Sequence, residues 1–298
     1  MAFKKSKNVI NMIKVGYLIA YDYHYVFNSL PHIYSYVDQI VFAIDINRKT
    51  WMGNDFDIDE DFFEKIKNFD LDHKISFYED QFYVEGEKPI DLDTRERRML
   101  ADYMGHNCWK IQIDSDEYCL HFNRLITYLK KNRFLLKKTA PPVNFLPTWI
   151  SLFKQVERGF FIIQPYHEVF SMVSNKPQYK YARNAHGMDI RINYNVIHQS
   201  WARTDEEILT KIENWGHSHD FDVMTFYQKW KDLNENNYRE YKDFHPIYKG
   251  LWNSLEFVEA KDINELLLKL ERRTNLNPVK VSSKLKKMRL KSLFHIKY

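Results

Sequence analysis

Three carboxylates stand within four residues at the end of an apolar stretch of this chain. Residues 109–113 alternate like a buried strand, and Asp114, Ser115, Asp116 and Glu117 follow directly. Carboxylate oxygens two residues apart can reach one side of a turn, and Mg²⁺ or Mn²⁺ takes oxygen ligands while leaving positions open for phosphate oxygens. The cluster therefore predicts either a divalent-cation site or a solvated turn where the strand ends.

The elements that must position this cluster alternate along the first 120 residues. We expect strands at 14–21, 39–46, 74–83 and 109–114, with helices between them at 27–38, 59–69 and 93–105. This order predicts an α/β fold with a mainly parallel sheet. Functional sites in such sheets lie beyond the carboxyl ends of the strands. Tyr21, Asp22, Asp45 and the 114–117 cluster are therefore expected to meet at one edge.

The second half is less regular. We expect extended segments at 144–155, 158–165, 178–183 and 189–201, and helices at 202–216, 219–235 and 261–274. The 202–216 helix has a predicted capping box of Thr204 and Glu207, a Glu207–Lys211 pair, and an end at Trp215 and Gly216. The chain contains no internal repeat and no linker-like change of composition. It is therefore expected to form one large domain at 1–220, followed by a helical C-terminal extension at 221–298.

Composition limits the classes of protein that fit. The chain has 298 residues, 44% of them hydrophobic, and a formal charge of +4, with six Lys, one Arg and no acid at 280–298. The rest is slightly acidic, which argues against a nucleic-acid-binding body. Cys108 and Cys119 form no disulfide framework, and no apolar run is long enough for a signal sequence or a membrane span. We expect a cytoplasmic protein. Its basic tail is either a solvated helix or a peripheral contact at the inner face of a membrane.

Residues 14–118 resemble the nucleotide-sugar-binding half of a family-2-like glycosyltransferase with the Rossmann-like GT-A fold. In that family an Arg-bearing helix precedes a strand of the form W-I-x-x-x-D-x-D-E, and this chain has TRERRML and then WKIQIDSDE. The second half agrees in order, with SLFKQ, then QPYHEVF, then NVIHQSWARTDEEILTKIENWGHS. The resemblance implies a GT-A domain at 1–220, with a nucleotide-sugar half at 14–118 and an acceptor and catalytic half at 119–220.

The resemblance also implies roles for individual residues, each of which has a plainer reading as a structural or solvated side chain. Mn²⁺ or Mg²⁺ would be held by Asp116, Asp114 and His198, and Asp114 would also contact the donor. His217 and His219 compete with His198 but follow a helix end. Glu168 would be the catalytic base that takes a proton from the acceptor hydroxyl, with a pKa raised by burial.

Further implied roles concern the two substrates. Tyr21, Asp45 and Arg97 would bind the nucleotide, with Arg95 and Arg98 as alternatives to Arg97. The acceptor cleft would be lined by His167, Trp201 and Arg203.

The resulting hypothesis is a metal-dependent, inverting glycosyltransferase of the hexosyltransferase type. It would move a sugar from a nucleotide-diphosphate sugar, with a UDP-sugar favoured, to a glycan or lipid-linked acceptor in bacterial-type polysaccharide synthesis. One alternative is a non-catalytic nucleotide- or glycan-binding protein on the same fold. Another is a metal-dependent nucleotidyltransferase, although the first strand leads into AYDYHY and not into a Gly-rich phosphate loop. No nucleic-acid partner is expected.

Overall fold

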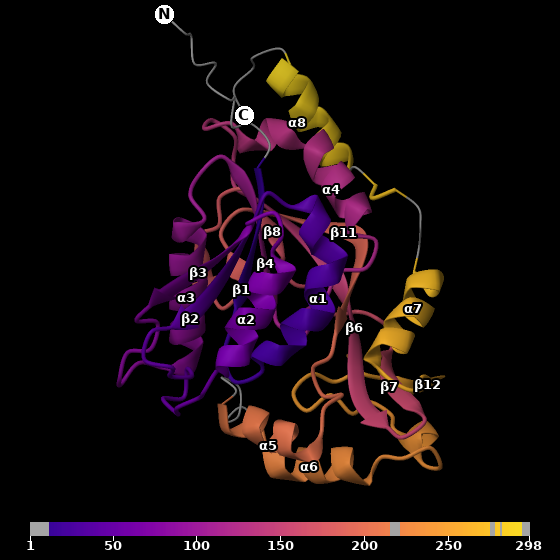
Figure 1. Ribbon diagram of the computed structural model, residues 1–298. Coiled ribbons are helices and arrows are strands. Elements are labelled where there is room, and N and C mark those ends of the chain that lie inside the picture. Colours follow the sequence, from indigo (N-terminus) through magenta and orange to yellow (C-terminus); the bar gives the residue numbers. More distant parts are fainter. Residues whose placement is uncertain (1–11, 215–220, 275–277, 281, 294–298) are drawn as a thin grey trace, which may run out of the picture.

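Strands and helices alternate from residue 12 to residue 114 in the predicted order (Figure 1). The computed structural model describes residues 12–214, 221–274, 278–280 and 282–293. Within them, four parallel strands lie in the order β4-β1-β2-β3. Their bounds are Met12–Leu18 for β1, Gln39–Asp45 for β2, Ile75–Asp80 for β3 and Cys108–Asp114 for β4. The predicted α/β fold with a mainly parallel sheet flanked by helices is confirmed.

Helices cover both faces of the parallel strands. On one face, α1, α2 and α4 contribute to the largest apolar cluster, and on the other α3 packs over β1 and β2. Helix α3 lies very close to β1 there, since a Cβ on Gly16 of β1 would lie 2.7 Å from Leu100 Cδ2 of α3. The helix bounds are Val26–Ile33 for α1, Glu60–Phe69 for α2, Pro89–Tyr103 for α3 and Phe122–Lys131 for α4.

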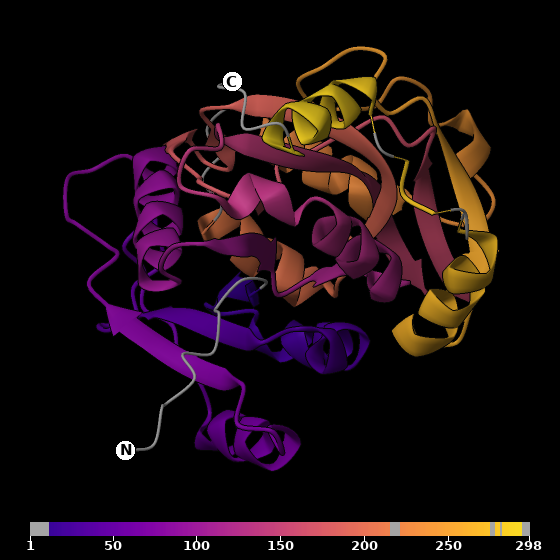
Figure 2. The ribbon, with the colours of Figure 1, turned by 90° about the horizontal axis from the view of Figure 1, so that it is seen from above.

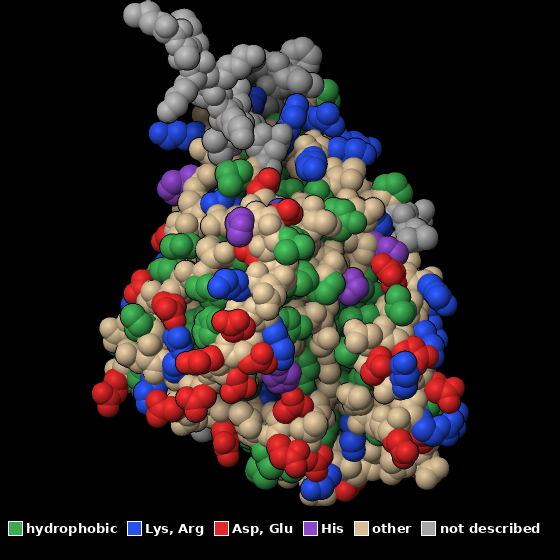
Figure 3. All heavy atoms as spheres, in the orientation of Figure 1, with side chains coloured by type: hydrophobic (Ala, Val, Ile, Leu, Met, Phe, Trp, Pro, Cys, Tyr) green, Lys and Arg blue, Asp and Glu red, His purple; other side chains and the backbone are tan. Residues whose placement is uncertain are grey.

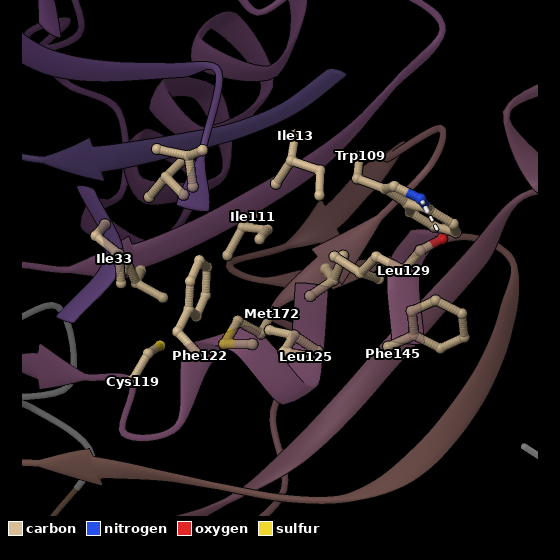
Figure 4. Packing of buried hydrophobic residues seen from close by; sticks show 14 of the residues in the cluster. Ile13, Ile33, Trp109, Ile111, Cys119, Phe122, Leu125, Leu129, Phe145 and Met172 are labelled. Atoms are coloured by element: carbon tan, nitrogen blue, oxygen red, sulfur yellow. Dashed lines mark hydrogen bonds between the residues drawn. The ribbon is translucent and has the colours of Figure 1, made fainter. Parts of the chain in front are cut away.

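The largest cluster joins the parallel strands to the second half of the chain. Figure 4 shows Trp109 of β4 next to Leu129 and Phe145, with the Trp109 indole N–H donating to the Leu129 carbonyl over 3.1 Å. Phe145 belongs to β6, so this contact fixes β6 against α4 and β4. The two halves therefore share one core.

The second half extends the sheet and brings the chain back to the same edge. The long β6 (Val143–Val156) pairs in parallel with β11 (Met188–His198) and antiparallel with β7 (Gly159–Gln164). The short strand β8 (Val173–Ser174) pairs with both β6 and β4 and so joins them, and β5 (Glu117–Tyr118) pairs with β11. His198 pairs with Glu117 in the register of β11 and β5. The end of β11 thus lies beside residues 114–117, which we call the acidic turn.

The remaining elements include one strand that the sequence analysis did not predict. β12 (Ser254–Glu259) pairs with β7 and so belongs to the main sheet, although 221–298 was expected to be helical. The other bounds are Tyr179–Tyr181 for β9, Asn184–Ala185 for β10, Asp205–Asn214 for α5, Val223–Asp232 for α6, Ile263–Arg273 for α7 and Ser283–Leu293 for α8. The 3₁₀ turns within the described ranges are Tyr23–Tyr25 (η1), Tyr34–Tyr36 (η2), Arg133–Leu136 (η3) and Tyr238–Glu240 (η4).

Two sequence predictions concern residues that the structure leaves undescribed, and one concerns membranes. The expected helix end at Trp215 and Gly216, and the alternative ligands His217 and His219, lie outside the described residues. Across the ranges that are described, none of the helices is long and apolar enough to cross a membrane. The predicted capping box of α5 is confirmed, since Thr204 N–H donates to Glu207 and Glu207 N–H donates to Thr204 Oγ1.

Candidate active site

A cavity of about 580 Å³ lies at the carboxyl edge of the parallel strands. Its wall takes residues that follow β1, β2 and β4, together with the end of β11, the segment 168–171 and the loop 245–248. The wall therefore comes from both halves of the chain. Asp22, Asp45, Asp114 and Asp116 all line it, as the convergence of strand ends led us to expect.

Asp114, the last residue of β4, lies between two buried arginines. Arg97 Nη2 of α3 donates to its Oδ1 over 3.1 Å, and Arg183, between β9 and β10, forms an ion pair with its Oδ2. Burial alone would raise the pKa of Asp114, but the guanidiniums of Arg183 and Arg97 together outweigh it and lower the pKa to about 2. Because both oxygens are already paired, the geometry favours Asp114 as an anchor for the two arginines. Its assignment as a metal ligand stays a prediction.

Asp116 is buried two residues further along the same turn. Arg203 Nη2 donates to its Oδ2 over 2.5 Å and to Asp22 Oδ2 over 2.8 Å, and Lys211 Nζ lies 3.9 Å from Asp116 Oδ2. Burial opposes ionisation, but the nearby positive charges lower the pKa of Asp116 below its ordinary value. Arg203 and Lys211 maintain this effect at neutral pH, where His198 is uncharged. The second oxygen, Oδ1, faces His198.

His198 ends β11 beside this turn. Its Nε2 lies 3.7 Å from Asp116 Oδ1, and its ring lies 4.9 Å from the Trp149 ring, centroid to centroid. Burial lowers the pKa of His198 to about 4, so the imidazole is neutral at pH 7. A neutral imidazole has a lone pair available for a cation. His198 thus lies beside Asp116, and its role as a metal ligand stays a prediction.

Glu117, the third carboxylate, points away from the cavity into the core. Its Oε1 accepts from Trp149 Nε1 over 2.9 Å, and its Oε2 accepts from Arg183 Nη1 over 3.0 Å. Burial, partly offset by Arg183, raises the pKa of Glu117 to about 7. Glu117 therefore supports the position of Arg183 and Trp149.

Glu168 lies in the cavity wall on the segment after β7. Its Oε2 accepts from Trp252 Nε1 over 2.7 Å, and its carbonyl accepts from the Trp149 N–H over 2.9 Å. Burial raises the pKa of Glu168 above its ordinary value, and the Trp252 hydrogen bond offsets part of that rise. Its neighbour His167 is exposed and does not line the cavity.

Of the three arginines left open as nucleotide contacts, Arg97 is the one that lines the cavity. Arg98 Nη2 donates to the Tyr179 carbonyl, and Arg95 Nη2 donates to the Gln81 carbonyl. Arg97 Nε also donates to Asp93 Oδ1 over 2.6 Å, so its side chain is fixed from two sides. Tyr21 lies in the cavity wall, and burial raises the pKa of its hydroxyl.

Asp45 is placed in the wall as predicted, but its carboxylate is already occupied. Oδ1 accepts from the N–H groups of Asn47 and Lys49, and Oδ2 accepts from those of Phe82 and Tyr83. Four backbone donors use all the acceptor positions of a carboxylate. Asp45 thus organises the loops after β2 and β3, and a direct contact with a nucleotide base stays a prediction.

The loop organised by Asp45 brings a further carboxyl group into the wall. Trp51 Nε1 donates to Glu96 Oε2 of α3 over 2.7 Å, and Glu96 is 6% exposed. Burial raises the pKa of Glu96 to about 8, so it is mostly protonated at pH 7. The buried hydroxyl of Thr50 has no hydrogen-bond partner in the described part of the chain. Thr50, Trp51 and Glu96 all line the cavity.

Two residues predicted to line the acceptor cleft have other main contacts. Arg203 binds Asp22 and Asp116 and stacks over the Tyr25 ring at 4.6 Å. Trp201 is 3% exposed and packs edge-on against Phe226 with ring centroids 4.8 Å apart. Both side chains line the cavity, but Arg203 binds Asp116 of the acidic turn, and Trp201 packs mainly in the core.

The sequence analysis missed two cations of the site. Arg183 follows no motif that would have singled it out. Lys211 was predicted to pair with Glu207, which is wrong. Its Nζ donates to the Ser200 carbonyl over 3.0 Å, whereas Glu207 accepts from His24 and Tyr25. Burial and the neighbouring Arg203 lower the pKa of Lys211 to about 8. Its turn of α5 faces the cavity because the capping box fixes where the helix begins.

The side chains at the acidic turn fit a divalent cation in part. Among the described residues, no group of three or more His, Cys, Asp or Glu side chains is placed to hold a metal ion. Asp116 Oδ1 and His198 Nε2, 3.7 Å apart, can both contact one ion at about 2.1 Å. Mg²⁺ is commonly bound by one or two side chains, with waters and phosphate oxygens as its other ligands. Asp116 and His198 therefore fit an ion that a diphosphate helps to bind.

Comparison with known proteins gives little further guidance. No protein-family model matches the chain, and no curated protein matches it. It is similar to mannose-6-phosphate isomerase from Helicobacter pylori, with 16% identity and a TM-score of 0.28 over 54% of this chain and 60% of that one. It is also similar to mannose-1-phosphate geranyltransferase from Thermus thermophilus, with 8% identity and a TM-score of 0.25 over 85% of this chain and 76% of that one. At such TM-scores neither likeness carries an argument, so the resemblance to family-2-like glycosyltransferases rests on the motifs.

Proposed function

We propose that this chain is a glycosyltransferase that moves a sugar from a nucleotide-diphosphate sugar to an acceptor hydroxyl. One observation carries the proposal: Asp116, His198 and Glu168, which come from three separate motifs, all line one cavity at the carboxyl edge of the sheet. Binding of charged phosphates and activation of a hydroxyl are the two tasks that such a transfer needs, and the cavity holds groups suited to each.

The acidic turn is the proposed diphosphate site. Asp116 and His198 would hold Mn²⁺ or Mg²⁺, which when bound would neutralise charge on the diphosphate. Arg203 and Lys211 lie against Asp116, and Arg97 and Arg183 lie against Asp114. Cations fixed in a buried wall stabilise negative charge more strongly than cations in water do. These four side chains are therefore suited to orient the donor and to favour departure of the nucleotide.

Glu168 is the proposed catalytic base for an inverting transfer. Its carboxylate lies in the wall and is oriented by Trp252. Burial raises its pKa, so its carboxylate takes a proton more readily than one in water. The acceptor hydroxyl would give its proton to Glu168 as its oxygen attacks the sugar carbon that bears the diphosphate. The bond between this carbon and the diphosphate oxygen breaks, and the nucleoside diphosphate leaves with the electron pair.

The donor and acceptor are proposed only by class. Thr50, Trp51 and Glu96 line the part of the wall next to Asp45, where a nucleotide base is proposed to bind, with a UDP-sugar favoured. The proposed acceptor is a glycan or lipid-linked hydroxyl on the cytoplasmic side of a membrane. His167 has no role in this proposal because it is exposed and does not line the cavity.

A thermal-shift panel tests metal and nucleotide binding together. UDP, GDP and CDP are each added with and without Mn²⁺, and at least one should raise the unfolding temperature more with metal than without it. Asp116→Asn should abolish the metal-dependent part of that shift while leaving the folded protein intact. Asparagine still accepts from Arg203, whereas alanine would leave this buried cation with one partner fewer and lower stability as well.

Asp61→Asn is the matched control, because Asp61 is exposed on α2 and far along the chain from the acidic turn. It should bind nucleotide and metal like the unmodified protein. A full metal-dependent shift in Asp116→Asn would contradict the metal assignment. No stabilisation by any nucleoside diphosphate would contradict the proposed function itself.

A further inference from the structure

The positive charge of the chain is concentrated in two segments that contain no acid. Residues 118–156 have seven Lys and Arg, residues 272–298 have nine, and neither segment has an Asp or Glu. The rest of the chain has 28 Lys and Arg against all 40 acids, a formal charge of −12. The charge is therefore distributed very unevenly along the chain, although its net value is only +4.

The fold brings parts of both segments to one end of the molecule. Helix α4 returns the chain from the acidic turn to the start of β6, and its last turn exposes Lys130 and Lys131. Helix α8 lies beside α4 in both ribbon views (Figures 1 and 2). Lys and Arg side chains gather over α8, whereas most acidic side chains on this face lie lower (Figure 3). We call this surface the basic end; its exposed cations include Lys130, Lys131, Arg133, Lys137, Lys138, Lys280, Lys284, Lys286, Lys287 and Arg289.

Helix α8 is fixed to the body by its apolar side. Leu285 is fully buried in the largest core cluster, and Met288 packs against the same cluster. The residues before α8 are anchored too, since the Lys280 N–H donates to Asn193 Oδ1 of β11 over 2.8 Å. The opposite side presents Lys284 and Lys287, with Leu290 beside them at 56% exposure.

We propose that the basic end is a docking surface for an anionic phospholipid bilayer. Clusters of about four to eight Lys and Arg bind the negative surface of such bilayers, and exposed apolar side chains beside them enter the headgroup region. Leu290 favours a lipid surface over a nucleic acid, which would be bound through phosphates alone. The acidic remainder of the molecule is repelled by the same surface, so the charge asymmetry selects one orientation.

This orientation has a consequence for the cavity. Helix α5, which brings Lys211 to the cavity, lies at the opposite end of the molecule from α8 (Figure 1). A molecule docked through the basic end therefore presents the cavity away from the bilayer. If the proposed function holds, this geometry fits an acceptor whose reactive end extends well beyond the headgroups and excludes a hydroxyl at headgroup level.

Vesicle co-sedimentation of the full chain tests the docking. We expect binding at low salt to vesicles of phosphatidylcholine mixed with phosphatidylglycerol, loss of that binding at high salt, and no binding to phosphatidylcholine alone. The double variant Lys284→Glu with Lys287→Glu should weaken binding at least about tenfold. Lys130→Glu with Lys131→Glu should weaken it as well, because both helices form the surface.

The matched control reverses the same number of charges elsewhere. Lys65→Glu with Lys67→Glu changes two exposed lysines of α2, outside the two acid-free segments, and should leave vesicle binding unchanged. All three double variants should keep the unfolding temperature and the nucleotide binding of the unmodified protein, so that failure here is separate from failure of the proposed function. Equal vesicle binding by the α8 variant and its control would overturn the proposal. So would tighter binding to duplex RNA or DNA than to the anionic vesicles.

Discussion

At the scale of single residues, the acidic turn is stable because each of its carboxylates has its own positive or hydrogen-bonding partner. Asp114 meets Arg97 and Arg183, Asp116 meets Arg203, and Glu117 accepts from a tryptophan and an arginine. Burying unpaired carboxylates this close together would be strongly unfavourable. The partners come from four separate parts of the chain, so the turn can form only in the completed fold.

The role of Glu168 can be separated from substrate binding by one substitution. Glu168→Gln keeps the shape and the acceptor for Trp252 Nε1, but an amide cannot take a proton. We expect nucleotide affinity to be unchanged and the transfer rate to fall by about 100-fold or more, the scale of a lost general base. Affinity and rate are measured on the same preparation. Transfer near the normal rate would exclude Glu168 from the mechanism.

Trp252→Phe is the companion variant, because it removes the hydrogen bond and keeps the carboxylate. That bond lowers the pKa of Glu168, so its loss should raise the pKa and move the acidic limb of the pH–rate profile to higher pH. If Glu168→Gln loses transfer activity but the pH–rate profile of Trp252→Phe does not shift, the hydrogen bond from Trp252 has no effect on catalysis.

Glu96 gives a prediction about stability and pH. Burial raises its pKa from 4.5 to about 8, so between these values the folded protein binds more protons than the unfolded chain. The free energy of unfolding therefore falls as pH rises through this window, by up to about 1.4 kcal/mol per pH unit. Glu96→Gln has no proton to lose and keeps an acceptor for Trp51. We expect it to be increasingly more stable than the unmodified protein as pH rises from 5 to 8, measured by urea unfolding.

Glu64→Gln serves as the comparison, since Glu64 is an exposed carboxyl of α2. Its stability should follow the unmodified protein at every pH. A constant difference between Glu96→Gln and the unmodified protein across the window would mean that Glu96 does not titrate as its burial requires.

Among the elements, the sequence predicted the strands and helices that are determined by a local pattern of residues. The apolar runs of β1, β2 and β4 and the spacing in α2 mark these elements in the sequence, and the capping box marks the start of α5. The parallel order then placed the acidic strand ends together without any structural information.

What the sequence did not reveal depends on partners distant along the chain. β12 pairs with β7, about 90 residues earlier, so its place in the sheet depends on a partner that its own short segment does not identify. Arg183 and Lys211 reach the acidic turn through the β9–β10 hairpin and α5, whose positions follow from packing. Asp45 shows the reverse case, where a correct location concealed a structural task. The position of the candidate site was thus predictable, whereas two of its four cations, Arg183 and Lys211, were not.

At the scale of the whole molecule, the predicted boundary at residue 220 crosses two apolar clusters. One cluster packs Leu120, Ile150 and Phe160 against Val258, Leu266, Leu267 and Leu270. Another packs Phe153 and Phe161 against side chains that follow the boundary: Phe226, Trp230, Trp252 and Leu255. The segment after the boundary also supplies Trp252 to Glu168. The division into a 1–220 domain and an extension stays a prediction, and these contacts argue that the first part needs the second.

A chain that ends at residue 220 should therefore fail to fold cooperatively. It loses eleven buried apolar side chains of these clusters. The eight named above are each worth about 1.5–3 kcal/mol, which is at least about 12 kcal/mol against a typical stability of about 5–15 kcal/mol. It also leaves β7 as an unpaired apolar edge, which promotes aggregation.

A chain that ends at residue 282 is the control, since it loses α8 but keeps both clusters and β12, and it should unfold cooperatively and still bind nucleotide. Circular dichroism during heating and size-exclusion chromatography compare the two. A monomeric, cooperatively unfolding 1–220 chain would establish that the extension is a separate addition and that the clusters contribute far less than their burial indicates.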